Sequence, residues 1–193
     1  MRRTLITLVV LLAFGGIKAQ YKTFVFGEYT YKTECHYNKN DFITIKIGMQ
    51  SLDQYPIELM IGTQKEYNSF INRLNYLKVK MIEWDSTCAE NNIGKIDKLI
   101  EFKVKKKEEP SVWFGKYYNS TPLLNAYARD NGKSKIIMHT GKVASLMNEY
   151  ITCKGGVIIF NSPQEIDEMI KAFNLTAIKS YIDAKNNNLE LLK

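Results

Sequence analysis

The residues with the greatest capacity for chemistry form one short cluster, Glu34-Cys35-His36. A carboxylate, a thiol and an imidazole can ligate a metal ion, and a thiol beside an imidazole can act as a nucleophile. Both uses need partners from elsewhere, and the chain shows no second set of residues with metal-ligand spacing. Along a strand, Cys35 would point away from Glu34 and His36. The pattern therefore favours a buried Cys35 beside a solvent-facing His36.

A second cluster, Asn131-Gly132-Lys133-Ser134, ends in the Gly-Lys-Ser of a phosphate-binding loop. That loop requires a glycine five positions before Gly132, where this chain has Tyr127. Asp130-Asn131-Gly132 instead predicts a tight turn between two strands. A Gly-x-Ser-x-Gly nucleophile elbow is also missing from the sequence. The sequence therefore assigns no catalytic, cofactor-binding or metal-ligating residue, and no cofactor is expected.

The longest basic run is Lys103-Val104-Lys105-Lys106-Lys107, followed directly by Glu108-Glu109. In a strand, Lys103, Lys105 and Lys107 would share one exposed face. Such a face could hold a phosphate or an anionic glycan. Lysines on an edge strand also deter edge-to-edge pairing, and the pattern favours this simpler interpretation.

The first nineteen residues have the three-part layout of a secretory signal peptide. Met1-Arg2-Arg3 is basic, residues 4–16 are uncharged and mostly apolar, and Ala19 precedes Gln20. The apolar run is shorter than the roughly 20 residues that span a bilayer. We expect cleavage after Ala19, export to the periplasm or the extracellular space, and no stable membrane span afterwards. The alternatives are a retained membrane anchor and an ordinary core helix.

Removal of residues 1–19 changes the charge and sets the redox environment of the cysteines. The 27 basic residues fall to 24 against 20 acidic ones, so the net charge drops from +7 to +4. The remaining chain contains Cys35, Cys88 and Cys153. An oxidising compartment would allow one disulfide and leave one thiol over, and three reduced, buried thiols are equally compatible with the sequence. Cys88 is expected just past the end of a helix, where it would be the most accessible.

The chain matches itself once without gaps, at an offset of 99 residues, where residues 59–66 lie over residues 158–165. In both segments an apolar strand leads into Thr63 or Ser162, with Glu66 or Glu165 three residues later. That spacing is a capping box, which begins a helix. The match suggests two diverged strand–helix repeats, with halves at residues 20–92 and 93–193. The two halves differ in sequence before the matched strand.

Apolar residues at steps of three and four follow each box, as on one face of a helix of about 20 residues. The first stripe is Tyr67, Phe70, Ile71, Leu74, Leu77, Met81 and Trp84; the second is Ile166, Met169, Ile170, Phe173, Ala177 and Tyr181. The opposite, polar face of the first helix is predicted to hold Asn68, Asn72, Arg73, Asn75 and Lys80.

The remaining pattern predicts strands at residues 22–32, 42–49, 57–61, 99–105, 112–118, 123–129, 135–139, 150–153 and 157–160. Lys154-Gly155-Gly156 predicts a hairpin between the last two. Together these elements predict one α+β domain over residues 20–193, in which two long amphipathic helices cover antiparallel sheet.

Three functions are compared. The leading hypothesis is an exported, non-enzymatic protein that binds an envelope or extracellular protein, peptide or glycan through its sheet or through the junction of its halves. The alternative is a secreted hydrolase whose carboxylate pair, or Cys35 and His36, assembles only in the fold. Nucleic-acid binding is not expected, because the charge is modest and no basic face is clustered. The strand region is rich in aromatic residues that suit a glycan if exposed, although burial is favoured: Tyr29, Tyr31, Tyr37, Trp113, Tyr117 and Tyr118.

Overall fold

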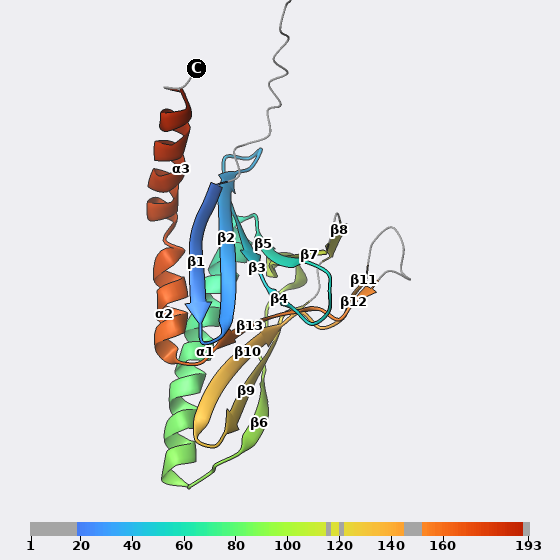
Figure 1. The fold of residues 1–193 in the computed structure, drawn as a ribbon, viewed down its shortest axis with the longest axis vertical. Helices are drawn as coiled ribbons and strands as arrows, with labels where there is room; N and C mark the ends of the chain where they lie inside the picture. Colours follow the sequence, from blue (N-terminus) through green and yellow to red (C-terminus); the bar gives the residue numbers. More distant parts are fainter. Residues whose placement is uncertain (1–18, 115–116, 120–121, 145–151, 191–193) are drawn as a thin grey trace, which may run out of the picture.

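The computed structural model describes residues 19–114, 117–119, 122–144 and 152–190. Two antiparallel sheets stand beside three helices, which lie along one side of the molecule (Figure 1). The fold is thus mixed α+β with antiparallel sheets, as the sequence predicts. The signal peptide expected at residues 1–19 lies outside the described residues except for Ala19.

The larger sheet contains six strands, formed mainly by the first half of the chain. Its order is β1 (Ala19–Phe26), β2 (Tyr29–Tyr37), β3 (Ile43–Gly48), β5 (Ile57–Ile61), β7 (Ser111–Phe114) and β8 (Tyr117–Asn119). Alternate residues face inward, as the pleat requires, and build much of the core: Phe24, Phe26, Tyr31, Cys35, Ile45, Ile47, Leu59 and Ile61.

The second sheet contains five strands and belongs mainly to the second half. Its order is β4 (Gln50–Ser51), β13 (Gly156–Phe160), β10 (Lys133–His139), β9 (Leu124–Asp130) and β6 (Ile96–Ile100). A separate pair is formed by β11 (Val143–Ala144) and β12 (Thr152–Cys153). The two sheets meet where the Ile159 amide donates to the Tyr31 hydroxyl at 2.8 Å, and residues of both belong to one core cluster.

Several predicted strands have different limits in the structure. Residues 22–32 contain a turn and form two paired strands, and the described residues of 112–118 belong to two strands, β7 and β8, that pair with each other. The hairpin predicted at Lys154-Gly155-Gly156 is wrong, because β12 pairs with β11 while β13 pairs with β10 and β4. At Gly155 the backbone has φ of 106°, and a Cβ there would lie 2.0 Å from the Gly141 carbonyl oxygen. Because Gly155 has no side chain, the backbone at Gly155 can pass close to the backbone at Gly141. Residues 150 and 151 lie outside the described part of the chain.

The first helix, α1 (Gln64–Glu90), is longer than predicted and has 27 residues. Its capping box forms as expected: the Thr63 hydroxyl accepts from the Glu66 amide at 3.2 Å, and the Glu66 carboxylate accepts from the Gly62 amide at 2.7 Å. The helix continues to Glu90 because Cys88 packs into the core. The prediction that Cys88 lies beyond a helix end and is accessible is therefore wrong.

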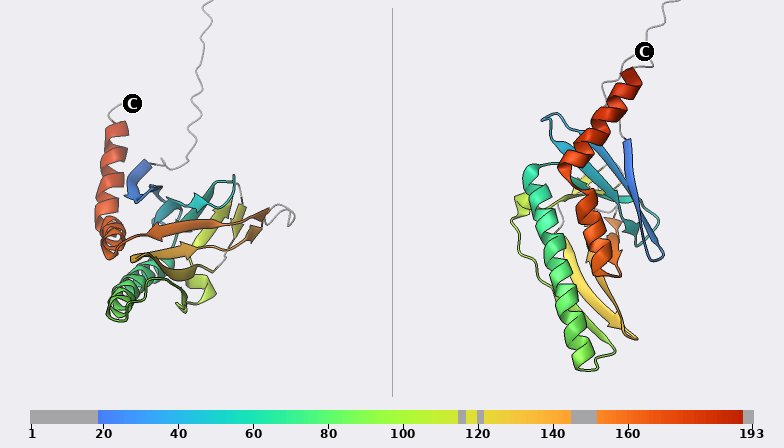
Figure 2. Two further views of the ribbon diagram at one scale, coloured as in Figure 1. Left: turned by 60° about the horizontal axis from the view of Figure 1, so that its bottom comes forward. Right: turned by 90° about the vertical axis from the view of Figure 1, so that its left-hand side faces the viewer.

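The second predicted helix is two helices, α2 (Pro163–Ala172) and α3 (Leu175–Glu190). It breaks at Asn174, whose side chain accepts from the Ala177 amide at 3.1 Å and so caps α3. α2 lies beside α1 (Figure 2), where Lys78 and Asp167 form an ion pair of 2.9 Å. Three helices thus replace the two that the sequence predicts.

The halves share an order of elements. β1, β2, β3 and β5 are consecutive neighbours in one sheet and precede α1; β6, β9, β10 and β13 are consecutive neighbours in the other and precede α2. Ser162 and Glu165 form a capping box with the same bonds as Thr63 and Glu66. Outside these elements the halves differ, because β7 and β8 of the second half extend the sheet of the first.

Within the described ranges, no helix is both long and apolar enough to cross a bilayer.

Candidate functional site

The site that the structure brings together lies where the two halves meet. After β6 ends at Ile100, the chain runs along α1 as residues 101–105 and closes in a short 3-10 turn, Lys106–Glu108. Phe102 and Val104 turn inward and are half-buried, while Lys103 and Lys105 are exposed. The strand predicted over residues 99–105 therefore ends at Ile100, and the lysines predicted to protect a sheet edge instead stand opposite α1.

A buried ion pair ties this segment to α1. The Arg73 Nη2 atom lies 2.6 Å from the Glu109 Oε1 atom, and the two side chains are only 1% and 7% exposed. The Arg73 guanidinium also lies against the Phe102 ring, 5.0 Å from its centre. Burial lowers the pKa of Arg73, and the Glu109 charge and hydrogen bond oppose that shift. The prediction that Arg73 lies on the polar face of the helix is wrong.

The pair leaves polar atoms without a partner in the described part of the chain. These atoms are buried: Arg73 Nε, Arg73 Nη1, Glu109 Oε2 and, one helical turn before Arg73, Ser69 Oγ. Buried polar atoms in folded proteins are nearly always hydrogen-bonded, and a buried ion pair contributes little net stability. A bound water or a ligand atom would satisfy such a cluster.

Ser69 lines a groove of about 580 Å³ between α1 and residues 102–108. The volume lies within the range of about 300–1,000 Å³ that is typical of small-molecule sites. Exposed side chains form most of its walls and offer nitrogen donors. The lining residues are Lys65, Asn68, Ser69, Asn72, Phe102, Lys103, Val104, Lys105 and Glu108. Because three lysines face one glutamate, the groove suits an anionic ligand.

A second cavity, of about 430 Å³, lies on the other side of residues 101–104. Its walls are more apolar and include Leu99 and Leu124, which are exposed. Glu109 and Asn125 also line it, and the buried Asn125 Oδ1 atom has no hydrogen-bond partner among the described residues. The two hollows share Phe102, Lys103 and Val104 in their linings, and Glu109 of the ion pair lines the second.

The cluster Glu34-Cys35-His36 does not assemble a nucleophile. Cys35 is buried in the core, and burial together with the nearby Glu34 charge raises the pKa of its thiol to about 12. Glu34 and His36 are half-buried on the opposite face of β2. A neutral, enclosed thiol is a poor nucleophile. Among the described residues, no group of three metal-capable side chains stands close enough to hold an ion.

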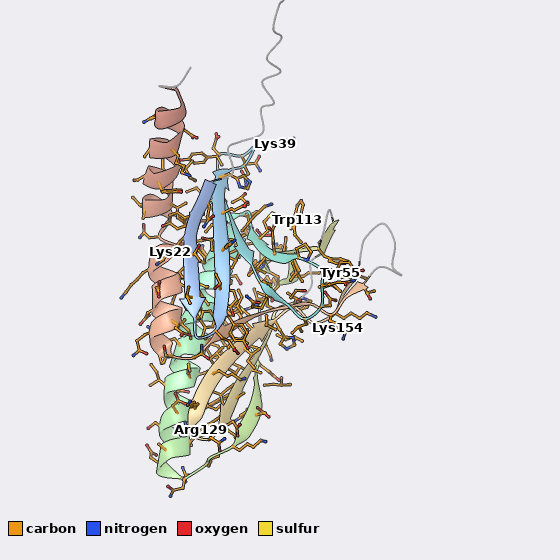
Figure 3. The ribbon with its side chains drawn as sticks, viewed as in Figure 1. Lys22, Lys39, Tyr55, Trp113, Arg129 and Lys154 are labelled. Atoms are coloured by element: carbon orange, nitrogen blue, oxygen red, sulfur yellow. The ribbon has the colours of Figure 1, made fainter. Side chains whose placement is uncertain are left out.

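The turn at Asn131-Gly132 joins β9 to β10, as the sequence predicts, with φ of 49° and 77° at these residues. Positive φ at both positions is typical of a two-residue hairpin turn. Ser134 is held by Arg129, whose Nη1 atom donates to its hydroxyl at 2.9 Å, and lies 3.0 Å from the Tyr127 hydroxyl. Arg129 lies beside the C-terminal end of α1 (Figure 3), where it bonds to Asp85 at 3.4 Å. These hydrogen bonds hold the β9–β10 hairpin against α1.

All three cysteines that the sequence left open for pairing are free and buried. The Cys153 thiol donates to Asp53 at 3.4 Å, and Asp53 also accepts from the Lys154 amide at 2.7 Å. Burial raises the pKa of Cys153. The three thiols therefore act as packed core groups, and none forms a disulfide here.

The described aromatic strand residues are buried or half-buried. Tyr31 is fully buried, and Tyr29 and Tyr37 pack partly buried against the core. Trp113 on β7 is half-buried (Figure 3), with the Lys46 ammonium 4.9 Å from its ring centre. The side chains of Tyr117 and Tyr118 lie outside the described residues. The preference for core burial is thus confirmed for Tyr31.

No protein-family model matches the chain, and comparison with curated proteins and with solved structures gives no match either.

Proposed function

We propose that the protein is an exported, non-enzymatic binding protein whose ligand occupies the groove between α1 and residues 102–108. The observation that supports this proposal most strongly is the Ser69 hydroxyl in the wall of that groove, which is buried and has no partner among the described residues. It lies one turn from the Arg73–Glu109 pair. Of these residues only Ser69 lines the groove, and a ligand oxygen or an ordered water there would give its hydroxyl a partner. A hydrolase receives less support, since the described residues bring neither Cys35 and His36 nor a metal-binding group into a hollow.

We further propose that the halves at residues 20–92 and 93–193 arose by duplication and that the groove developed at their junction. One wall comes from the helix of the first half and the other from the β6–β7 connection of the second. At the offset of 99, Ser69 and Arg73 correspond to Glu168 and Ala172. The Ser69 and Arg73 side chains of α1 are therefore not repeated at the corresponding positions of α2.

The binding proposal is tested by filling the groove. Asn72 is exposed and lines it, so Asn72→Trp should plug it without disturbing the core. Asn75→Trp places the same side chain at an exposed position of the same helix, outside the groove, and is the matched control. In pull-downs from soluble envelope fractions, Asn72→Trp should lose a component that the parent chain and Asn75→Trp retain. Equal capture by all three proteins would contradict the groove proposal.

The export proposal has its own test. Mass spectrometry of the protein recovered from the periplasm or the medium should give a chain that begins at Gln20. A chain recovered in the cytoplasm with residues 1–19 intact would contradict it.

A further inference from the structure

We propose that the groove binds an acidic saccharide, one that carries sugar carboxylates. This inference rests on the proposed binding function and adds to it the class of ligand.

Charge is the first argument. Lys65 approaches the groove from α1, and Lys103 and Lys105 approach it from the facing segment, so cations stand on both walls. Among the described residues of the lining, Glu108 is the one acidic side chain. An ammonium on each wall can pair with carboxylates on both sides of a chain of sugars, whereas a neutral ligand would leave these charges unused.

The uncharged polar groups are the second argument. Asn68 and Asn72 stand one helical turn apart and present side-chain amides, which both donate and accept hydrogen bonds. The buried Ser69 hydroxyl between them also does both. Amides and hydroxyls in this arrangement complement a ligand that is itself rich in hydroxyls. A phosphate ester alone would use only the donors.

The aromatic content is the third argument and separates a saccharide from a single-stranded nucleic acid. Nucleic-acid grooves rely on exposed aromatic rings on which bases stack. The described lining of the groove has one ring, Phe102, which is half-buried and packed against Arg73 and against the Tyr76 ring, 5.7 Å away. These contacts reduce the ring surface on which a base could stack.

The test measures binding of tri-galacturonate and of its fully methyl-esterified form to the mature chain by calorimetry. The two ligands differ in charge and share their hydroxyls. We expect tri-galacturonate to bind, the ester to bind at least about tenfold more weakly, and the difference to shrink at high salt, since exposed charges are screened. The double variant Lys103→Ala/Lys105→Ala should weaken binding of the acid by about tenfold and leave binding of the ester unchanged. Lys106→Ala/Lys107→Ala, which alters exposed lysines outside the lining, should change neither.

The outcomes separate the two proposals. If acid and ester bind equally, or if a single-stranded oligonucleotide or an acidic peptide displaces tri-galacturonate from the groove, the saccharide assignment is overturned and the binding function stands. If neither saccharide binds while an envelope component still distinguishes Asn72→Trp from Asn75→Trp, the ligand class is again wrong. If no component distinguishes these two variants, both proposals fail.

Discussion

Arg73 on α1 and Glu109 before β7 form a buried ion pair of 2.6 Å that joins the two halves of the chain. The pair uses one nitrogen and one oxygen, and its remaining polar atoms have no partner in the described part of the molecule. Arg73 packs against Phe102, which lines both the groove and the more apolar cavity, so the pair supports a wall of the candidate site.

Removing one member of the pair should be costly because it strands the other charge in the core. We expect Glu109→Gln to lower the free energy of unfolding by about 3–5 kcal/mol, measured by urea denaturation. Arg73→Met combined with Glu109→Leu should cost much less, since no charge is then left buried. A Glu109→Gln protein as stable as the parent would show that the pair is not buried in solution.

The two capping boxes should contribute similarly to stability. Thr63→Ala and Ser162→Ala each remove a hydroxyl that accepts from a helix amide. Each should lower the free energy of unfolding by about 1 kcal/mol. Ser86→Ala, at an exposed position within α1, is the control and should change it by less than about 0.5 kcal/mol. A loss at Thr63 with none at Ser162 would argue against equivalent helix starts.

The hydrogen bonds that the Asp53 carboxylate accepts from Cys153 and from the Lys154 amide should make the stability of the protein sensitive to acid. Hydrogen bonds, chiefly from the Lys154 amide, hold the pKa of Asp53 below its ordinary value of 3.8. A carboxylate with a depressed pKa stabilises the fold above the unfolded value and loses that effect as the pH falls through the folded value. The melting temperature of the parent should therefore exceed that of Asp53→Asn at pH 6, and the gap should close below about pH 4. A gap that is constant with pH would contradict the assignment.

The cysteines should resist alkylation in the native protein. A thiol with a pKa of about 12, as at Cys35, is almost wholly protonated at pH 8, and Cys88 and Cys153 are also buried. Iodoacetamide followed by peptide mass spectrometry should label all three in urea and none, over minutes, in buffer. Rapid labelling of Cys35 in the folded protein would revive a nucleophilic role.

Local signals in the sequence predict local structure well. The capping boxes at Thr63 and Ser162 and the turn at Asn131-Gly132 form as expected because each depends on a few neighbouring residues. The break at Asn174 was missed because the apolar stripe continues through it, although an asparagine can cap a helix.

The candidate site was harder to predict because its parts are distant in sequence. Lys65 and Asn72 meet Phe102 and Lys105 only when the second half packs on α1. One signal was present: Arg73 follows Phe70 by three residues and precedes Leu77 by four, which places it on the apolar stripe. A charged residue at a core position of a helix indicates a buried partner. Only the fold shows that the partner of Arg73 is Glu109.

The most direct test of the account is to map where tri-galacturonate contacts the labelled mature chain, by amide chemical shifts in nuclear magnetic resonance. The account predicts saturable shifts confined to residues 65–73 of α1 and residues 102–109 of the facing segment, and their absence in Asn72→Trp. Shifts centred instead on Lys46 and Trp113 of the larger sheet, or none at saturating ligand, would contradict it.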